Sequence, residues 1–212
     1  QVKSLILTEF RMISVVFGSK KSKKTAFSED LLNGYLGSKY FIASMRPLGD
    51  SDKEKVERFR KQREGKGFVT IEQDVAIVKA IDKIKWMESL LGTNDSENAG
   101  KKAALIANIP AICANEMFLK SGEVVSSKDV EQTILMGLAF LKEYFTDIVV
   151  ISDEEADLMY YADADTKSGI ENGLYKDTTE YEKAMNELNA SLKNLSDEIY
   201  IYDKDRLRFE RL

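Results

Sequence analysis

The sequence contains no histidine among its 212 residues, and this absence removes several kinds of chemistry at once. Without imidazole there is no Ser-His-Asp triad, no Cys-His pair, no histidine-ligated zinc site and no phospho- or nucleotidyl-histidine intermediate. A single cysteine, Cys113, excludes an intrachain disulfide and a metal site built from several cysteines. Its neighbours Ile112 and Ala114 are apolar, so a buried small side chain is expected there and not a nucleophile.

Long hydrophobic runs are also missing. No stretch approaches the roughly 20 apolar residues that a membrane helix needs, and charged residues interrupt the first 17 positions too often for a signal peptide. These absences predict a cytoplasmic protein with no membrane partner. The balance of 31 basic against 36 acidic residues gives a net charge of −5, which argues against a nucleic-acid partner. Residues 1–11 are interpreted as an N-terminal extension or a cloning remnant, and residues 12–212 as a single α/β domain.

Short apolar runs, rich in β-branched and aromatic residues, alternate with longer amphipathic stretches. Continuous runs of this kind are typical of strands covered on both faces. Strands that alternate with helices predict a mainly parallel sheet with right-handed crossovers, and therefore a three-layer α/β fold. The expected strands are residues 13–17, 39–44, 103–109, 147–151 and 198–202, with a shorter run at 68–71.

Helical periods fall between these runs. Apolar positions three and four residues apart predict helices over residues 78–91, 130–145 and 181–195, with Ser126 or Ser127 as the cap of the second. Residues 50–64 are highly charged and predict an exposed helix.

The segment 152–176 has no clear period, and its acidic, glycine-containing composition predicts a mobile surface loop. Asp163 and Asp165 hint at a calcium loop. The hint fails because Ser168 stands where such a loop needs glycine, and Leu174 where it needs an acidic ligand. A solvated acidic loop is the expected structure.

One segment has the composition of a phosphate-binding loop, and it lies between a predicted strand and a predicted helix. The pattern G-x-x-x-x-G-K-[ST] is matched at Gly18, Lys24 and Thr25, whereas Lys23 stands where the second glycine belongs. The whole candidate loop reads Gly18, Ser19, Lys20, Lys21, Ser22, Lys23, Lys24 and Thr25.

Each position in this loop has a separate physical role. Gly18 permits a sharp turn off the strand, and the loop amides with the helix N-terminus form an anion cradle. Lys24 would reach the terminal phosphates of a nucleotide, and the Thr25 hydroxyl would bind Mg²⁺. A side chain at Lys23 could point outward or fold over the site. The alternative is a solvated basic turn without a ligand.

With the segments that follow, this loop resembles that of the bifunctional adenosylcobinamide kinase/adenosylcobinamide-phosphate guanylyltransferase family, whose loop is G-G-x-x-S-G-K-S. The family motifs Y-I-A-T, D-x-E-M-x-x-R-I and W-x-T-x-E are similar to residues 40–44, 52–59 and 68–72. Its closing N-x-x-L-x-x-x-x-D-E-V is matched by Asn189, Leu192, Asp197, Glu198 and Ile199. The resemblance covers roughly residues 12–202.

The resemblance implies a P-loop NTPase-like (RecA-like) fold, often assembled as a trimeric homo-oligomer, and a place in cobalamin synthesis. It implies GTP or ATP with Mg²⁺ as cofactors and a corrinoid, cobinamide, as substrate. Members phosphorylate the aminopropanol arm of adenosylcobinamide and then transfer GMP to that phosphate through a guanylylated histidine.

The sequence departs from this family at its chemistry. Gln62 stands at the position of the histidine, and an amide cannot carry GMP. Ala107 stands where the family has an acidic residue at the end of its third strand. The family motif T-N-E-V-G becomes residues 152–156, in which only Glu154 is kept, and two family arginines are missing from residues 180–184.

Two functional hypotheses follow. The chain is a divergent relative that binds a nucleoside triphosphate and retains kinase chemistry, or it is a catalytically inactive paralogue acting as a partner or regulator. For the first, Asp153 and Glu154 are candidate catalytic carboxylates, because they follow a strand at the edge where α/β sites form. A solvated loop start is their alternative explanation. A third possibility is an α/β protein whose basic loop binds only stray anions.

Overall fold

The computed structural model describes residues 11–19, 21–45, 50–91, 100–155, 157–175 and 178–212. The described strands form one sheet in the order β3-β2-β4-β5-β1-β6-β7. Every pairing in it is parallel except that of β6 with β7. The strands are β1 (Met12–Phe17), β2 (Ser38–Ala43), β3 (Phe68–Glu72), β4 (Lys102–Ile106), β5 (Asp147–Ser152), β6 (Glu198–Asp203) and β7 (Arg208–Arg211).

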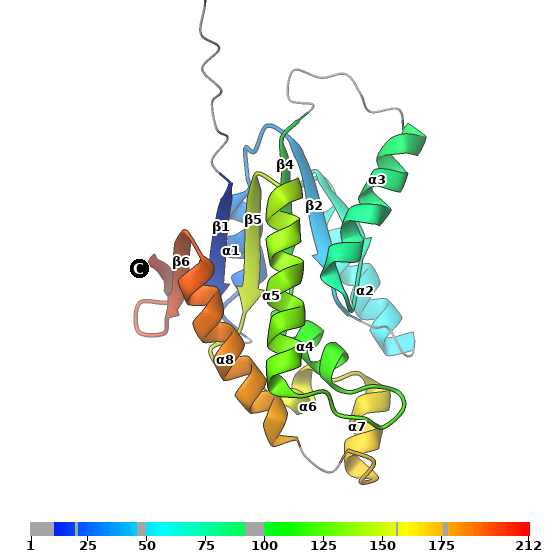
Figure 1. The fold of residues 1–212 in the computed structure, drawn as a ribbon. Coiled ribbons are helices and arrows are strands. Elements are labelled where there is room, and N and C mark those ends of the chain that lie inside the picture. The colour runs from blue at the N-terminus through cyan, green and yellow to red at the C-terminus, as the bar shows by residue number, and fades with distance from the viewer. Residues whose placement is uncertain (1–10, 20, 46–49, 92–99, 156, 176–177) are drawn as a thin grey trace, which may run out of the picture.

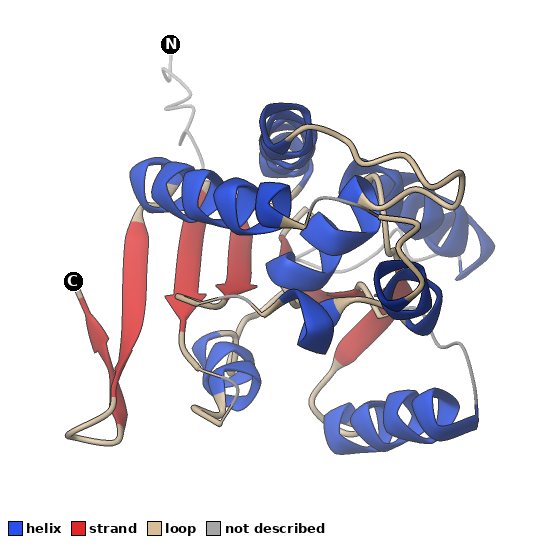
Figure 2. Ribbon diagram, turned by 90° about the horizontal axis from the view of Figure 1, so that it is seen from below, coloured by secondary structure: helices blue, strands red, loops and turns tan. Residues whose placement is uncertain are grey.

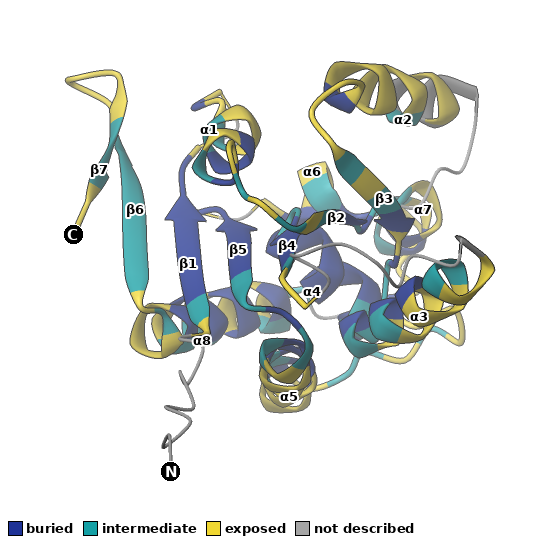
Figure 3. Ribbon diagram, turned by 90° about the horizontal axis from the view of Figure 1, so that it is seen from above, coloured by how far each residue is buried: buried dark blue, intermediate teal, exposed yellow. Residues whose placement is uncertain are grey.

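Helices cover both faces of this sheet and make the predicted three-layer α/β fold (Figures 1 and 3). One face carries α1 (Lys24–Leu31) and α2 (Asp50–Arg63). The other carries α3 (Ala80–Leu91), α5 (Ser127–Tyr144) and α8 (Thr179–Leu195). None of the described helices is long and apolar enough to cross a membrane.

Shorter helices lie toward the carboxyl ends of the parallel strands, the end that faces the viewer in Figure 2. They are α4 (Ile109–Met117), α6 (Leu158–Tyr161) and α7 (Ala164–Glu171), and a 3₁₀ turn, η1 (Ile77–Lys79), precedes α3. The topology therefore places the segments that follow β1, β4 and β5 at one end of the sheet, where ligand sites of open α/β folds form.

The core has two parts because side chains of a strand alternate between the faces of a sheet. Ile13, Val15 and Phe17 of β1 belong to the larger part, under α3, α4, α5 and α8, whereas Val16 belongs to the smaller part under α1. Cys113 of α4 lies in the larger part and is fully buried, as the sequence predicted. Burial raises the pKa of its thiol to about 12, so the unreactive neutral form prevails at physiological pH.

The six predicted strands all form, but one of them is shorter than the sequence predicted. The strand expected over residues 103–109 ends at Ile106, and Ile109 begins α4. Asn108 takes a left-handed backbone conformation with φ of 69°, which turns the chain, and Pro110 lies in the first helical turn, where proline is tolerated.

The prediction of a surface loop over residues 152–176 is wrong. The segment folds into α6 and α7, with Thr166 and Gly169 buried in α7 and Tyr175 buried after it. The Tyr175 ring packs against Phe118, and its hydroxyl donates to the Leu119 carbonyl over 2.8 Å. Long-range packing of this kind leaves no periodic signal in so short a helix.

The acidic pair in this segment has a structural explanation. Asp163 is the N-cap of α7, and its carboxylate accepts a hydrogen bond of 2.7 Å from the backbone N–H of Thr166. An N-terminal cap is a common use of aspartate, because the first helical amides lack partners within the helix. Among the described residues there is no group of three or more acidic, cysteine or histidine side chains able to hold a metal.

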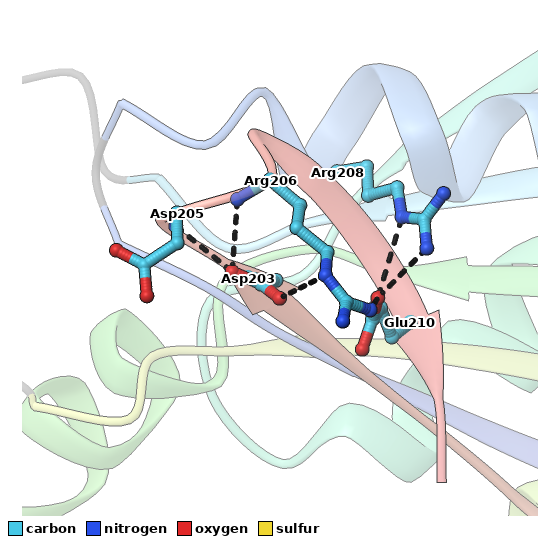
Figure 4. A network of polar contacts seen from close by, with 5 residues as sticks. All are labelled: Asp203, Asp205, Arg206, Arg208 and Glu210. Carbon is cyan, nitrogen blue, oxygen red and sulfur yellow. Dashed lines mark hydrogen bonds and ion pairs between the residues drawn. The ribbon is translucent and has the colours of Figure 1, made fainter.

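An antiparallel hairpin of β6 and β7 closes the sheet at the edge beside β1, and the sequence did not predict its second strand. Its turn is held by the polar network shown in Figure 4. The Asp203 carboxylate accepts from the backbone N–H groups of Asp205 and Arg206 over 2.8 and 3.0 Å. Glu210 pairs with Arg206 and Arg208, and these contacts lower the pKa of the Glu210 carboxyl.

The same hairpin packs against α1. The Phe27 ring stacks on Phe209 with 4.2 Å between centroids and meets Tyr200 edge-on at 5.3 Å. Both distances lie in or near the range of favourable aromatic pairs. The helix α1, which follows β1, therefore packs against the β6–β7 hairpin, which is distant from it in the sequence.

Candidate functional site

The candidate loop, residues 18–25, joins the end of β1 to the start of α1. Gly18 is buried, and a Cβ atom there would lie 2.4 Å from the Ser22 Oγ and 3.3 Å from the Tyr202 Cβ. A larger residue at this turn would therefore force the Ser22 hydroxyl to move. The Ser22 hydroxyl and amide both donate to the Ser19 carbonyl, over 2.8 and 3.1 Å, and close the loop. Lys20 lies outside the described residues.

Lys23, which stands where the pattern has its second glycine, takes the backbone conformation of a glycine. Its φ and ψ are 58° and 28°, in the left-handed region, and it is the N-cap of α1. A side chain in that region costs roughly 1–2 kcal/mol. The Lys23 side chain is exposed, and no side chain caps α1, so the first helical amides keep their capacity to bind an anion.

Lys24 turns back over the loop. Its ammonium donates to the carbonyls of Gly18 and Ser19 over 3.2 and 3.4 Å, and it forms an ion pair with the Asp153 Oδ1 atom. Only 12% of the Lys24 side chain and 1% of the Asp153 side chain are exposed. The structure thus brings the loop lysine together with one of the two candidate carboxylates.

The carboxylate of Asp153 is held from several sides. The Tyr161 hydroxyl of α6 donates to its Oδ2 atom. Burial and this carboxylate raise the pKa of the Tyr161 phenol, which keeps the phenol a hydrogen-bond donor. On the backbone, the Asn189 amide of α8 donates to the Asp153 carbonyl over 2.8 Å, and Asn189 in turn accepts from Ser152 over 2.8 Å.

The other candidate residues are more open. Glu154 is exposed and does not share the contacts of Asp153 with Lys24 and Tyr161. Thr25 is exposed in the first turn of α1, and Ser19 and Lys21 are exposed in the loop. The sequence missed Tyr161, because it lies in the segment interpreted as a loop and belongs to no motif.

The donor set fits a nucleotide-borne magnesium ion. Mg²⁺ prefers oxygen ligands and keeps several waters, so it is usually bound by one or two carboxylates together with substrate phosphates. The loop offers the Thr25 hydroxyl, and the segment after β5 offers the buried Asp153 carboxylate. Among the described residues its Oδ1 atom accepts no hydrogen bond and is paired with Lys24.

The structure also describes two residues, Gln62 and Ala107, at which the sequence departs from the family pattern. Gln62 lies exposed on α2, in a hollow of about 760 Å³ along that helix. Ala107, just after β4, contributes no carboxylate, and its carbonyl accepts from the Ser44 hydroxyl over 3.0 Å. The described residues that line the hollow are Lys53, Glu54, Glu57, Arg58, Lys61 and Gln62.

Comparisons with known proteins give a family match and matches among solved structures. A model of the family described as cobinamide kinase / cobinamide phosphate guanyltransferase matches residues 14–203. No curated protein matches the chain. Among solved structures, the chain is similar to one described as an ATPase domain, with a TM-score of 0.45 and 7% sequence identity over 92% of this chain and 70% of that chain.

Proposed function

Because the chain belongs to the cobinamide kinase / cobinamide phosphate guanyltransferase family, a family of nucleotide-using enzymes in cobalamin biosynthesis, we propose that it binds a nucleoside triphosphate at residues 18–25. The observation that carries this proposal is the backbone of Lys23. Lys23 stands where the pattern has glycine, yet its backbone lies in the left-handed region and its side chain is exposed. This supports a loop whose amides can form an anion cradle without the second glycine.

In this proposal Lys24 leaves its contacts with the loop carbonyls and Asp153 to neutralise the terminal phosphates. Thr25 and Asp153 are the residues that would hold Mg²⁺, and Asp153 takes over from the carboxylate that Ala107 does not provide. Bound Mg²⁺ would supply charge neutralisation at the phosphates. The protein's own contribution is to orient the phosphates through the loop amides and to keep the Asp153 carboxylate out of bulk water.

The reaction that fits these groups is phosphoryl transfer to the hydroxyl of the cobinamide arm, since that reaction depends mainly on positioning and charge neutralisation. Guanylyl transfer through histidine is outside this chemistry, because the sequence has no histidine and Gln62 stands at its position. ATP and GTP are both candidate donors. The cytoplasmic location, the trimeric assembly and the lack of a nucleic-acid partner stay predictions.

One observation favours a second candidate function, that of an inactive partner or regulatory protein. Lys24 is already neutralised by a carboxylate that is 1% exposed, and a phosphate must compete with that contact. Together with Ala107 and Gln62, this arrangement would suit a chain that binds nucleotide weakly and does not turn it over.

Calorimetric titration with ATP and GTP, each with Mg²⁺, tests the proposal. We expect micromolar binding of at least one nucleotide and its loss in Lys24→Ala. Lys128→Ala is the control, because it removes an exposed lysine of α5, outside residues 18–25, and should leave affinity unchanged. No heat for either nucleotide at millimolar concentration would overturn the nucleotide site. Phosphate transfer from the bound nucleotide to cobinamide then separates a kinase from the inactive partner.

A further inference from the structure

Tyr161 reaches the phosphate loop through a single intermediary. It belongs to α6, which follows β5, and its hydroxyl donates to the Oδ2 atom of Asp153. The other oxygen of the same carboxylate, Oδ1, forms the ion pair with Lys24. One carboxylate therefore joins a tyrosine outside the loop to the lysine inside it.

The two oxygens of Asp153 are not equivalent in this arrangement. Oδ2 accepts a hydrogen bond from a neutral donor, whereas Oδ1 pairs with the Lys24 ammonium and, among the described residues, accepts no hydrogen bond. When a ligand draws Lys24 away, Oδ1 is a buried oxygen that has lost its charged partner. Leaving a buried carboxylate oxygen unpaired costs free energy, unless a cation or a hydrogen-bond donor takes the place of the lysine.

Asp153 is fixed at its backbone and enclosed at its side chain. Its backbone carbonyl accepts from the Asn189 amide of α8, and its side chain is 1% exposed. The two oxygens of a carboxylate are chemically equivalent, so the tyrosine hydrogen bond acts by fixing the rotation of the carboxylate plane, and with it the direction in which the oxygen beside Lys24 points. Hydrogen bonds that orient a metal-binding carboxylate commonly determine how well it binds the metal.

Resting on the proposed function, the geometry points to Tyr161 as a positioning residue that aims the Asp153 Oδ1 atom at the phosphate loop and thereby sets the Mg²⁺ requirement of nucleotide binding. It acts through Asp153 and does not itself contact Lys24. The segment after β5, with α6 at its centre, thus becomes a working part of the nucleotide site.

The first test needs no nucleotide. Unfolding by urea is measured for the wild type, Tyr161→Phe, Lys24→Met and the double variant. We expect the two changes to be non-additive, by roughly threefold or more in the unfolding equilibrium constant, since both act on one carboxylate. Additive effects would overturn the coupling between Tyr161 and Lys24, whatever the protein binds.

The second test measures the Mg²⁺ concentration that half-maximally promotes ATP or GTP binding in calorimetry. For Tyr161→Phe we expect an increase on the order of tenfold, with little change in affinity for the metal-free nucleotide. The matched control is Tyr175→Phe. It also removes a buried tyrosine hydrogen bond, to the Leu119 carbonyl, but does not touch Asp153, and its Mg²⁺ requirement should stay that of the wild type.

The outcomes separate the two proposals. A wild type that binds nucleotide and a Tyr161→Phe variant with an unchanged Mg²⁺ requirement would overturn the role of Tyr161 alone. A wild type that binds no nucleotide would overturn the proposed function and, with it, any Mg²⁺ role for Tyr161, while the unfolding experiment still decides whether Tyr161 and Lys24 are coupled. An equal Mg²⁺ shift in both tyrosine variants would show a general structural effect and also contradict the inference.

Discussion

The loop of residues 18–25, after β1, and the segment after β5 start side by side, because Phe17 and Ser152 are paired in adjacent parallel strands. The two regions differ in how far the sequence predicted them. The loop between a strand and a helix was predicted from a spacing of a few residues, and Lys23 takes a left-handed backbone conformation at the position where the pattern has glycine. The segment after β5 showed no spacing at all, yet it folds into α6 and α7 with buried side chains. A short stretch of sequence can predict where the backbone must turn, but it cannot predict packing against elements that are distant in the chain.

The most damaging change should be Tyr175→Ala, which attacks the packing of the segment after β5. The ring is buried against Phe118, and its hydroxyl donates to a backbone carbonyl, so we expect a loss of about 3–5 kcal/mol in the free energy of unfolding. Urea denaturation measures it. The exposed neighbour Leu174 is the control, and Leu174→Ala should cost less than about 1 kcal/mol. Equally small losses of unfolding free energy in both variants would show that Tyr175 is not packed, and that the segment is the surface loop predicted from its composition.

Asp153→Asn acts at the contact between the loop and the segment after β5, and its expected effect on the free energy of unfolding is smaller than that of Tyr175→Ala. The amide still accepts from Tyr161 but no longer neutralises Lys24, so stability should fall by about 1–3 kcal/mol. Metal-free nucleotide should bind more tightly, because phosphate no longer competes with a carboxylate for the ammonium, and the stimulation by Mg²⁺ should disappear. Calorimetry with and without Mg²⁺ measures both effects. Glu154→Gln, one residue further along, should change neither. A wild-type Mg²⁺ response in Asp153→Asn would remove Asp153 from the site.

Lys23→Gly should have the smallest effect, and in the stabilising direction. Glycine adopts the left-handed conformation without strain but loses more entropy on folding, so the net gain should be about 0.5–1 kcal/mol in urea denaturation. Nucleotide affinity, measured by calorimetry, should fall by roughly threefold, because the change removes one positive charge near the bound phosphates while the backbone keeps its conformation.

The control for this change is Leu207→Gly in the β6–β7 turn, where φ is 52° and the side chain is exposed. The same relief of strain should stabilise the protein there without changing nucleotide affinity. If both variants changed nucleotide affinity to the same extent, the effect would come from overall stability and not from the Lys23 charge.

Much of the framework was predictable, and particular residues show why the rest was not. Apolar runs such as that around Val15 and Val16 identified the strands, and the spacing from Gly18 to Lys24 identified the loop. The sequence could not reveal that Asp153 pairs with Lys24, or that Tyr161 lies beside them. Those contacts depend on how β5 and α6 are placed in space, and no local pattern records that placement.

The position of β1 has a consequence for synthesis. This first strand pairs with β5 and β6, both formed from residues beyond position 146, and α1 rests on the β6–β7 hairpin through Phe27. During translation, residues 12–31 leave the ribosome long before their partners exist. The loop of residues 18–25 is therefore made well before the strands and the hairpin that hold β1 and α1 in place. A nascent chain must keep its apolar first strand from aggregating until almost all of the described residues have emerged.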